Sequence, residues 1–198
     1  MKFAVGALRQ RDGITCGPAV AVLAGAMLDA EYGSMLRDAG AAGAWFAGEQ
    51  QRVHAQVNAV WPRRLGTTPA GMARALTERA RVCGLRYRWR CRRGRCDRLT
   101  DVLAAVGEGR PVAVLIGRVV PRHWVLLVEA GGGTLRCYEP SSGVTRSVSV
   151  DALRHGRLTG LGFPRAFAFV LPSCATRAVC PESIQRTNSS LRDSALTE

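Results

Sequence analysis

The front part of the chain carries its apolar side chains in the pattern of three helices. Residues 19–28 form an apolar, alanine-rich run without turn signals. Because Pro18 is tolerated in a first helical turn, this buried helix is expected to begin at or just before Cys16. Residues 44–60 are amphipathic and predict a second helix. A Thr-Thr-Pro start and a glycine stop predict a third helix over residues 67–84.

The pattern changes from helices to strands in the second half. Short apolar or alternating runs predict strands, and two of these runs flank three consecutive glycines, whose positive backbone angles suit a hairpin. The strands are expected at residues 85–91, 111–116, 123–130, 135–138 and 166–171, with a short helix at 99–106. A helical front half followed by an antiparallel sheet predicts an α+β domain.

The length of 198 residues fits one domain with an extension. Residues 1–172 are expected to form the domain, and the polar residues 173–198 a disordered tail. No apolar stretch approaches the roughly 18–20 residues of a membrane helix. The apolar run within residues 1–10 is too short for a signal peptide. A cytoplasmic protein without a membrane span is therefore expected.

The net charge of +13 comes almost entirely from arginine, a skew that GC-rich coding produces. Arginines are densest in the segment 86–98, where they alternate with Tyr87, Trp89 and Cys91. This alternation predicts a strand with a solvated arginine face and an apolar face toward the core. No helix-turn-helix, zinc-finger or RNA-binding signature is present, so nucleic acid is not the expected partner. A patch for phosphate or an acidic partner stays as the alternative.

The seven cysteines do not predict a disulfide framework, because their number is odd and no export signal is seen. Cys83, Cys91 and Cys96 are spaced too unevenly for a zinc knuckle and have no histidine nearby. They are expected to be buried or incidental thiols. Neither a metal nor a cofactor is expected, and Cys16 is the cysteine whose context suggests chemistry.

Cys16 is the candidate nucleophile. A helix N-terminus lowers the pKa of a thiol and so favours the thiolate, which is the attacking species. Gly17 is expected to leave room for a substrate backbone. Gln10, six residues upstream, can donate its side-chain amide to an oxyanion, with the Cys16 amide as a second donor. Taken alone, Gln10 has the character of a surface loop residue.

His123 is the candidate general base, because it opens a predicted strand that would hold it rigidly. His54 and His155 lie in helical segments and are expected to be structural. His123 and Glu139 are equidistant from residue 131, so a hairpin centred there would place them opposite each other, with Cβ atoms about 5 Å apart. Glu139 would then orient the imidazole, although a one-residue register change would separate the two side chains.

Together these motifs resemble the papain-like cysteine peptidases, and among them the C39-like, bacteriocin-processing type. Gln10 opens a Gln-x5-Cys-Gly-Pro motif, and His123 opens the strand His-Trp-Val-Leu-Leu-Val. Glu139 begins Glu-Pro-Ser-Ser-Gly, which resembles the acidic-residue-Pro-x-x-Gly segment of that group, and residues 109–115 resemble the strand before the histidine. The resemblance covers most of residues 8–172 and implies a papain-like fold.

The resemblance also implies a thiol hydrolase that acts on a peptide or amide substrate. Cys16 would form a thioester after His123 takes its proton, Gln10 would stabilise the tetrahedral intermediate, and water would release the product. Two alternatives stay open. An acceptor amine or thiol in place of water would make the protein an acyltransferase. A binding or adaptor module with a basic surface would keep the fold without turnover, and Glu139 favours it because that group usually has aspartate there.

Overall fold

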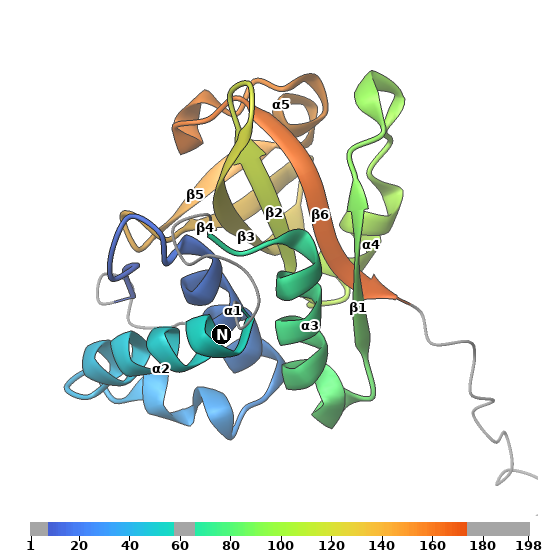
Figure 1. Ribbon diagram of the computed structural model, residues 1–198. Helices are drawn as coiled ribbons and strands as arrows, with labels where there is room; N and C mark the ends of the chain where they lie inside the picture. The colour runs from blue at the N-terminus through green and yellow to red at the C-terminus, as the bar shows by residue number, and fades with distance from the viewer. Residues whose placement is uncertain (1–7, 58–65, 174–198) are drawn as a thin grey trace, which may run out of the picture.

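The computed structural model describes residues 8–57 and 66–173 (Figure 1). The predicted end of the second helix at 58–60, and the predicted tail apart from Ser173, lie outside the described residues. The α-helices are α1 (Cys16–Leu28), α2 (Ala42–Val57), α3 (Pro69–Ala80), α4 (Thr100–Gly107) and α5 (Val150–His155). The 3₁₀ helices include η1 (Tyr32–Arg37), η3 (Arg81–Cys83), η4 (Gly94–Cys96) and η5 (Thr159–Leu161).

Local signals set the helix ends. α1 begins at Cys16, as predicted. α3 begins after Thr68, whose hydroxyl accepts a hydrogen bond from the Gly71 amide at 3.0 Å. The third predicted helix is divided, because the α-helical turns end at Ala80 and a 3₁₀ turn continues to Gly84. The φ of 64° at Gly84 ends this segment where the sequence predicted a stop.

Six antiparallel strands form one sheet. They are β1 (Arg86–Cys91), β2 (Val112–Gly117), β3 (Pro121–Gly131), β4 (Thr134–Glu139), β5 (Val144–Ser149) and β6 (Arg165–Ser173). Their order in the sheet is β1-β6-β2-β3-β4-β5. β5 is absent from the predicted strands because its six residues contain a single buried side chain, Val148, and so show no apolar alternation.

Both faces of the sheet are covered, so the fold has two apolar cores (Figure 1). α1, α2 and α3 pack on one face, in a core that includes Phe46 and Trp124. α4 and α5 pack on the other face, in a core that includes Leu153 and Phe169. The predicted α+β fold, with a helical front half packed on an antiparallel sheet, is confirmed.

The predicted division of β1 into an arginine face and an apolar face is wrong at its far end. Tyr87 is buried and hydrogen-bonds through its backbone to Thr77 of α3, but Trp89 is 47% exposed. The strand lies at an edge of the sheet, and the helical cover does not extend to Trp89. Arg90, in contrast, is partly buried by ion pairs with acidic side chains, so one of the arginines expected in solvent is structural.

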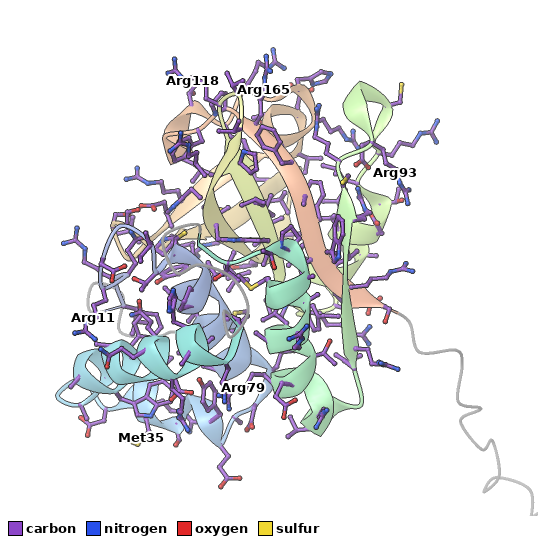
Figure 2. All side chains as sticks on the ribbon, viewed as in Figure 1. Arg11, Met35, Arg79, Arg93, Arg118 and Arg165 are labelled. Atoms are coloured by element: carbon purple, nitrogen blue, oxygen red, sulfur yellow. The ribbon has the colours of Figure 1, made fainter. Side chains whose placement is uncertain are left out.

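The basic surface is not confined to the arginine-rich segment 86–98. Figure 2 shows Arg11, Arg93 and Arg118 projecting outward on different sides of the molecule. Arg90, inside the segment, is neutralised by Asp97 at 2.7 Å and Asp101 at 2.6 Å. The high positive charge is therefore distributed over several elements.

Candidate active site

Cys16 is the first residue of α1 and is buried, with 5% of its surface exposed. The loop before it is folded back onto Thr15, whose hydroxyl accepts hydrogen bonds from the amides of Arg11 and Asp12 at 3.0 and 3.1 Å. The Thr15 carbonyl accepts the first helical bond, from Ala19. The helix start, and with it the thiol, is thus fixed by the preceding loop.

Gly17 is surrounded by protein. A Cβ atom there would lie 2.4 Å from Thr67 Oγ1 and 3.3 Å from Trp124 Cδ1. The Trp124 indole donates to the Thr67 carbonyl at 2.8 Å, so these two residues form one packed unit against the helix. The expectation that Gly17 leaves room for a substrate backbone is therefore wrong, because the absent side chain makes room for Thr67 and Trp124.

The pKa of the Cys16 thiol is raised above its ordinary value, which favours the neutral form. Burial raises its pKa, the amides of Trp124, Gly17 and Cys16 itself lower it, and the Glu139 carboxylate raises it again. The amides at the helix start lower the pKa of the thiol, but burial outweighs them, so the predicted lowering that would favour the thiolate is wrong.

His123 and Glu139 form a buried pair. The distance between His123 Nε2 and Glu139 Oε1 is 2.9 Å, and each residue has 7% of its surface exposed. Burial lowers the pKa of His123, while the hydrogen bond and charge of Glu139 raise it, and the net shift is downward. A neutral imidazole that donates from Nε2 to the carboxylate has Nδ1 as its acceptor nitrogen.

The hairpin between His123 and Glu139 is not centred on residue 131, as its symmetry predicted. Its tip is the two-residue turn Gly132-Gly133, with φ angles of 57° and 75°. With this tip the two side chains are not directly opposite each other, so the predicted register is wrong.

A bulge in the hairpin nevertheless brings the two side chains together. Between Leu127 and Glu129 the pairing shifts by one residue. Beyond this shift Glu139 comes level with Val125, two residues from His123 and on the same face of the sheet. Without the bulge Glu139 would come level with the next residue and point to the opposite face. The contact is therefore diagonal, and it depends on the bulge.

Glu139 remains ionised in spite of its burial. Burial raises its pKa, but the Ser142 hydroxyl, the Ser141 amide and His123 lower it further, to about 2. Ser142 Oγ lies 2.6 Å from Oε2 of the carboxylate, and the Ser141 amide donates to Oε1 at 2.8 Å. The carboxylate is thus held by the turn that follows it as well as by the imidazole.

Gln10 lies against the same turn. Its backbone amide donates to the Pro140 carbonyl at 2.7 Å, and its side-chain Oε1 accepts from the Ser141 hydroxyl at 3.4 Å. Its side-chain nitrogen donates one hydrogen to the Asp12 carbonyl at 2.7 Å. The chain segment that precedes Cys16 and the segment that follows Glu139 are therefore joined at Gln10.

Gln50 holds the backbone on both sides of Gln10, a role that sequence reasoning missed. This fully buried side chain of α2 accepts from the Arg11 amide at 3.1 Å and donates to the Arg9 carbonyl at 3.0 Å. The available signal was its position, because Gln50 is a polar residue in the apolar stripe that continues with Val53. A polar residue on a buried helix face indicates a specific hydrogen-bond role.

The other two histidines lie outside this group. His155 is exposed at the end of α5, where its Nδ1 lies 2.8 Å from an Asp151 carboxylate oxygen. His54 is buried on α2. Over residues 8–57 and 66–173, no cluster of histidine, cysteine or acidic side chains is suited to hold a metal ion. Within these same ranges no helix has the length and apolar character to cross a membrane.

No protein-family model and no curated protein matches the chain. Among solved structures, the chain is similar to a double-glycine-motif protease from an AMS/PCAT transporter, solved in complex with the leader peptide. The two are 14% identical, with a TM-score of 0.46, and the match covers 86% of this chain and 91% of that one. The chain is also similar to the Pseudomonas avirulence protein AvrPphB, at 15% identity and a TM-score of 0.44, covering 80% and 90% of the two chains. The chemistry of the site depends on the geometry given above.

Proposed function

We propose that the protein is a cysteine peptidase or amidase in which Cys16 is the nucleophile, His123 the general base and Glu139 the residue that orients it. The observation that carries this proposal is the buried His123–Glu139 pair, whose carboxylate adds to burial in raising the pKa of the Cys16 thiol at the start of α1. Trp124, which follows His123 directly, interacts through its amide with the Cys16 thiol. A thiol, an imidazole and a carboxylate that orients the imidazole are the groups that nucleophilic acyl chemistry requires.

The reaction begins with a neutral thiol and a neutral imidazole. His123 Nδ1 takes the proton of Cys16 as the sulfur attacks the carbonyl carbon of a peptide or amide bond. The Cys16 amide and the Gln10 side chain donate to the oxyanion that develops on the carbonyl oxygen. The C–N bond breaks, His123 returns the proton to the leaving amine, and the acyl group stays on sulfur as a thioester. Water, deprotonated by His123, then releases the acid and restores the thiol.

The contact between Glu139 and His123 also bears on the binding-module alternative. That alternative was favoured by glutamate at a position where the resembled group usually has aspartate. Because the longer side chain reaches His123 at 2.9 Å, this substitution no longer favours an inactive module. The acyltransferase alternative has no observation of its own to support it.

Cleavage of a diverse peptide mixture tests the proposal. New peptide ends identified by mass spectrometry are expected with the wild-type protein and not with Cys16→Ala. Cys83→Ala, which removes an exposed cysteine, is the matched control and is expected to cleave normally. Cleavage that persists in Cys16→Ala, or no cleavage and no acylation of Cys16 by the wild type, would overturn the proposal. Products joined to an added amine in place of free acids would identify an acyltransferase.

A further inference from the structure

The carboxylate of Glu139 is bound by a complete set of donors from the turn that follows β4. Oε1 accepts from the Ser141 amide at 2.8 Å and lies 2.9 Å from His123 Nε2. Oε2 accepts from the Ser142 amide at 2.9 Å and from the Ser142 hydroxyl at 2.6 Å. Each oxygen therefore has two partners, and the oxygen that faces away from His123 is held entirely by Ser142.

The hydroxyls of Ser142 and Ser141 depend on the residue type, and that of Ser142 lowers the pKa of Glu139 more than that of Ser141 does. The two amides are present for any residues in the turn, whereas the 2.6 Å bond requires a hydroxyl at position 142. A glutamate has one more rotatable bond than an aspartate, so its carboxylate needs a second anchor to keep one oxygen aimed at the imidazole.

We propose that Ser142 is a positioning residue, which fixes the Glu139 carboxylate from behind and so sets the orientation and tautomer of His123. The inference rests on the proposed function, because it assigns Ser142 a role in the action of that base. Ser142 touches no reacting atom. It acts through Glu139 alone.

The same turn links the orienting carboxylate to the oxyanion donor. The Pro140 carbonyl accepts from the Gln10 amide at 2.7 Å, and the Ser141 carbonyl accepts from the Arg9 side chain at 3.1 Å. At Gly143, whose φ is 70°, a Cβ atom would lie 3.0 Å from the Leu8 carbonyl oxygen. The turn is therefore packed against residues 8–10, and Ser142 holds Glu139 from a fixed position.

The groups that influence Glu139 come from three elements. His123 hydrogen-bonds Glu139 from β3, and burial and the charge of Glu139 raise the pKa of Cys16 on α1 and of Cys137 and Tyr138 on its own strand. Of these, His123 is the group whose ordinary pKa is nearest neutrality, and burial lowers it. A change in how Glu139 is held is therefore expected to appear in the titration of His123.

Three variants test the inference: Ser142→Ala removes the hydroxyl, Ser142→Thr retains it, and Ser147→Ala changes an exposed serine of β5. In ¹⁵N NMR of the imidazole, Ser142→Ala is expected to lower the His123 titration midpoint and to reduce the population protonated at Nε2. Alkylation of Cys16 by iodoacetamide, measured by peptide mapping from about pH 5 to 9, is expected to slow about ten-fold, as the loss of one charge-assisted hydrogen bond predicts. Ser142→Thr and Ser147→Ala are expected to match the wild type.

The two readouts separate this inference from the proposed function. A wild-type His123 titration in Ser142→Ala would overturn the role of Ser142, and so would identical behaviour of the Ala and Thr variants. A further outcome is that His123→Ala leaves Cys16 alkylation unchanged while Ser142→Ala still shifts the His123 titration. That result would contradict the proposed function but support the positioning of the His123–Glu139 pair by Ser142. Thermal melting of each variant identifies loss of folding. If Ser142→Ala does not fold, the His123 titration of Ser142→Thr is compared with that of the wild type, and a difference between them would overturn the role of the hydroxyl.

Discussion

At the scale of single residues, Glu139 shows how local hydrogen bonds keep a charge inside the molecule. Its carboxylate is buried, which raises its pKa, yet the Ser142 hydroxyl, the Ser141 amide and His123 bring that pKa down to about 2. A glutamate in the unfolded chain titrates near 4.3. Since the folded pKa is the lower one, ionised Glu139 stabilises the fold at pH values above the unfolded pKa, and this contribution is lost as pH falls toward 2.

Glu139→Gln is therefore expected to change the acid dependence of stability. The wild-type free energy of unfolding should fall between about pH 4.5 and pH 2 more steeply than that of the variant, by on the order of 2 kcal/mol in total. Urea unfolding across this range measures the difference. Asp97 and Asp101, whose pKa values are also lowered, titrate in both proteins and cancel in the comparison. Parallel curves for the two proteins would contradict the assigned pKa of Glu139.

Gly17→Ala is expected to destabilise the protein by about 1–3 kcal/mol, because the new Cβ would lie 2.4 Å from Thr67 Oγ1 and the packed Thr67–Trp124 unit would have to move. Gly48→Ala is the matched control. Gly48 lies in α2 with nothing within 4 Å of its missing Cβ, so alanine there is expected to be neutral or to stabilise by up to about 1 kcal/mol. Urea unfolding of both variants checks the pair, and an equally stable Gly17→Ala would contradict the close contact.

At the scale of elements, the sequence predicted the elements that carry Cys16 and His123 better than the pairing of the hairpin. The helix start at Cys16 and the strand that begins near His123 follow from apolar runs and from proline, and both are present. The register of the hairpin does not follow from such patterns, because three adjacent glycines allow several turns and the bulge near Leu127 has no residue signature. Ser142 and Gln50 were not foreseen for the same reason, since their partners are distant in the sequence or set by turn geometry.

Helix α2 reaches the site through one side chain, and Gln50→Leu tests its role. The substitution would remove the donor to the Arg9 carbonyl and one of the two acceptors of the Arg11 amide, which keeps Thr15 Oγ1, so a loss of about 1–3 kcal/mol of stability is expected. Hydrogen exchange at the Arg11 amide should accelerate. Gln51→Leu, at the exposed neighbouring position, is the control and is expected to change neither quantity. Unchanged hydrogen exchange at the Arg11 amide in Gln50→Leu would contradict the role of Gln50 in holding the backbone on both sides of Gln10.

At the scale of the whole molecule, the site lies where the helical half meets the sheet. Cys16 belongs to a helix that is buried along most of its length in the first core, while His123 and Glu139 are fixed by hairpin register. The distance between Cys16 and His123 is therefore set by the packing of α1 on the sheet. Trp124 is central to that packing, because it is almost fully buried and contacts both the helix start at Gly17 and the carbonyl of Thr67.

Trp124→Phe is expected to weaken this junction while keeping an apolar ring in it. Phenylalanine is smaller and cannot donate to the Thr67 carbonyl, so stability should fall by about 1–3 kcal/mol. Alkylation of Cys16 should also become less dependent on His123, because the two halves are no longer held in one register. Trp89→Phe makes the same chemical change on an exposed side chain of β1 and should leave both quantities unchanged. A different outcome is that Trp124→Phe lowers stability but leaves the His123 dependence of Cys16 alkylation intact. The rest of the first core would then hold α1 on the sheet. Trp124 would contribute packing without setting the geometry of the site.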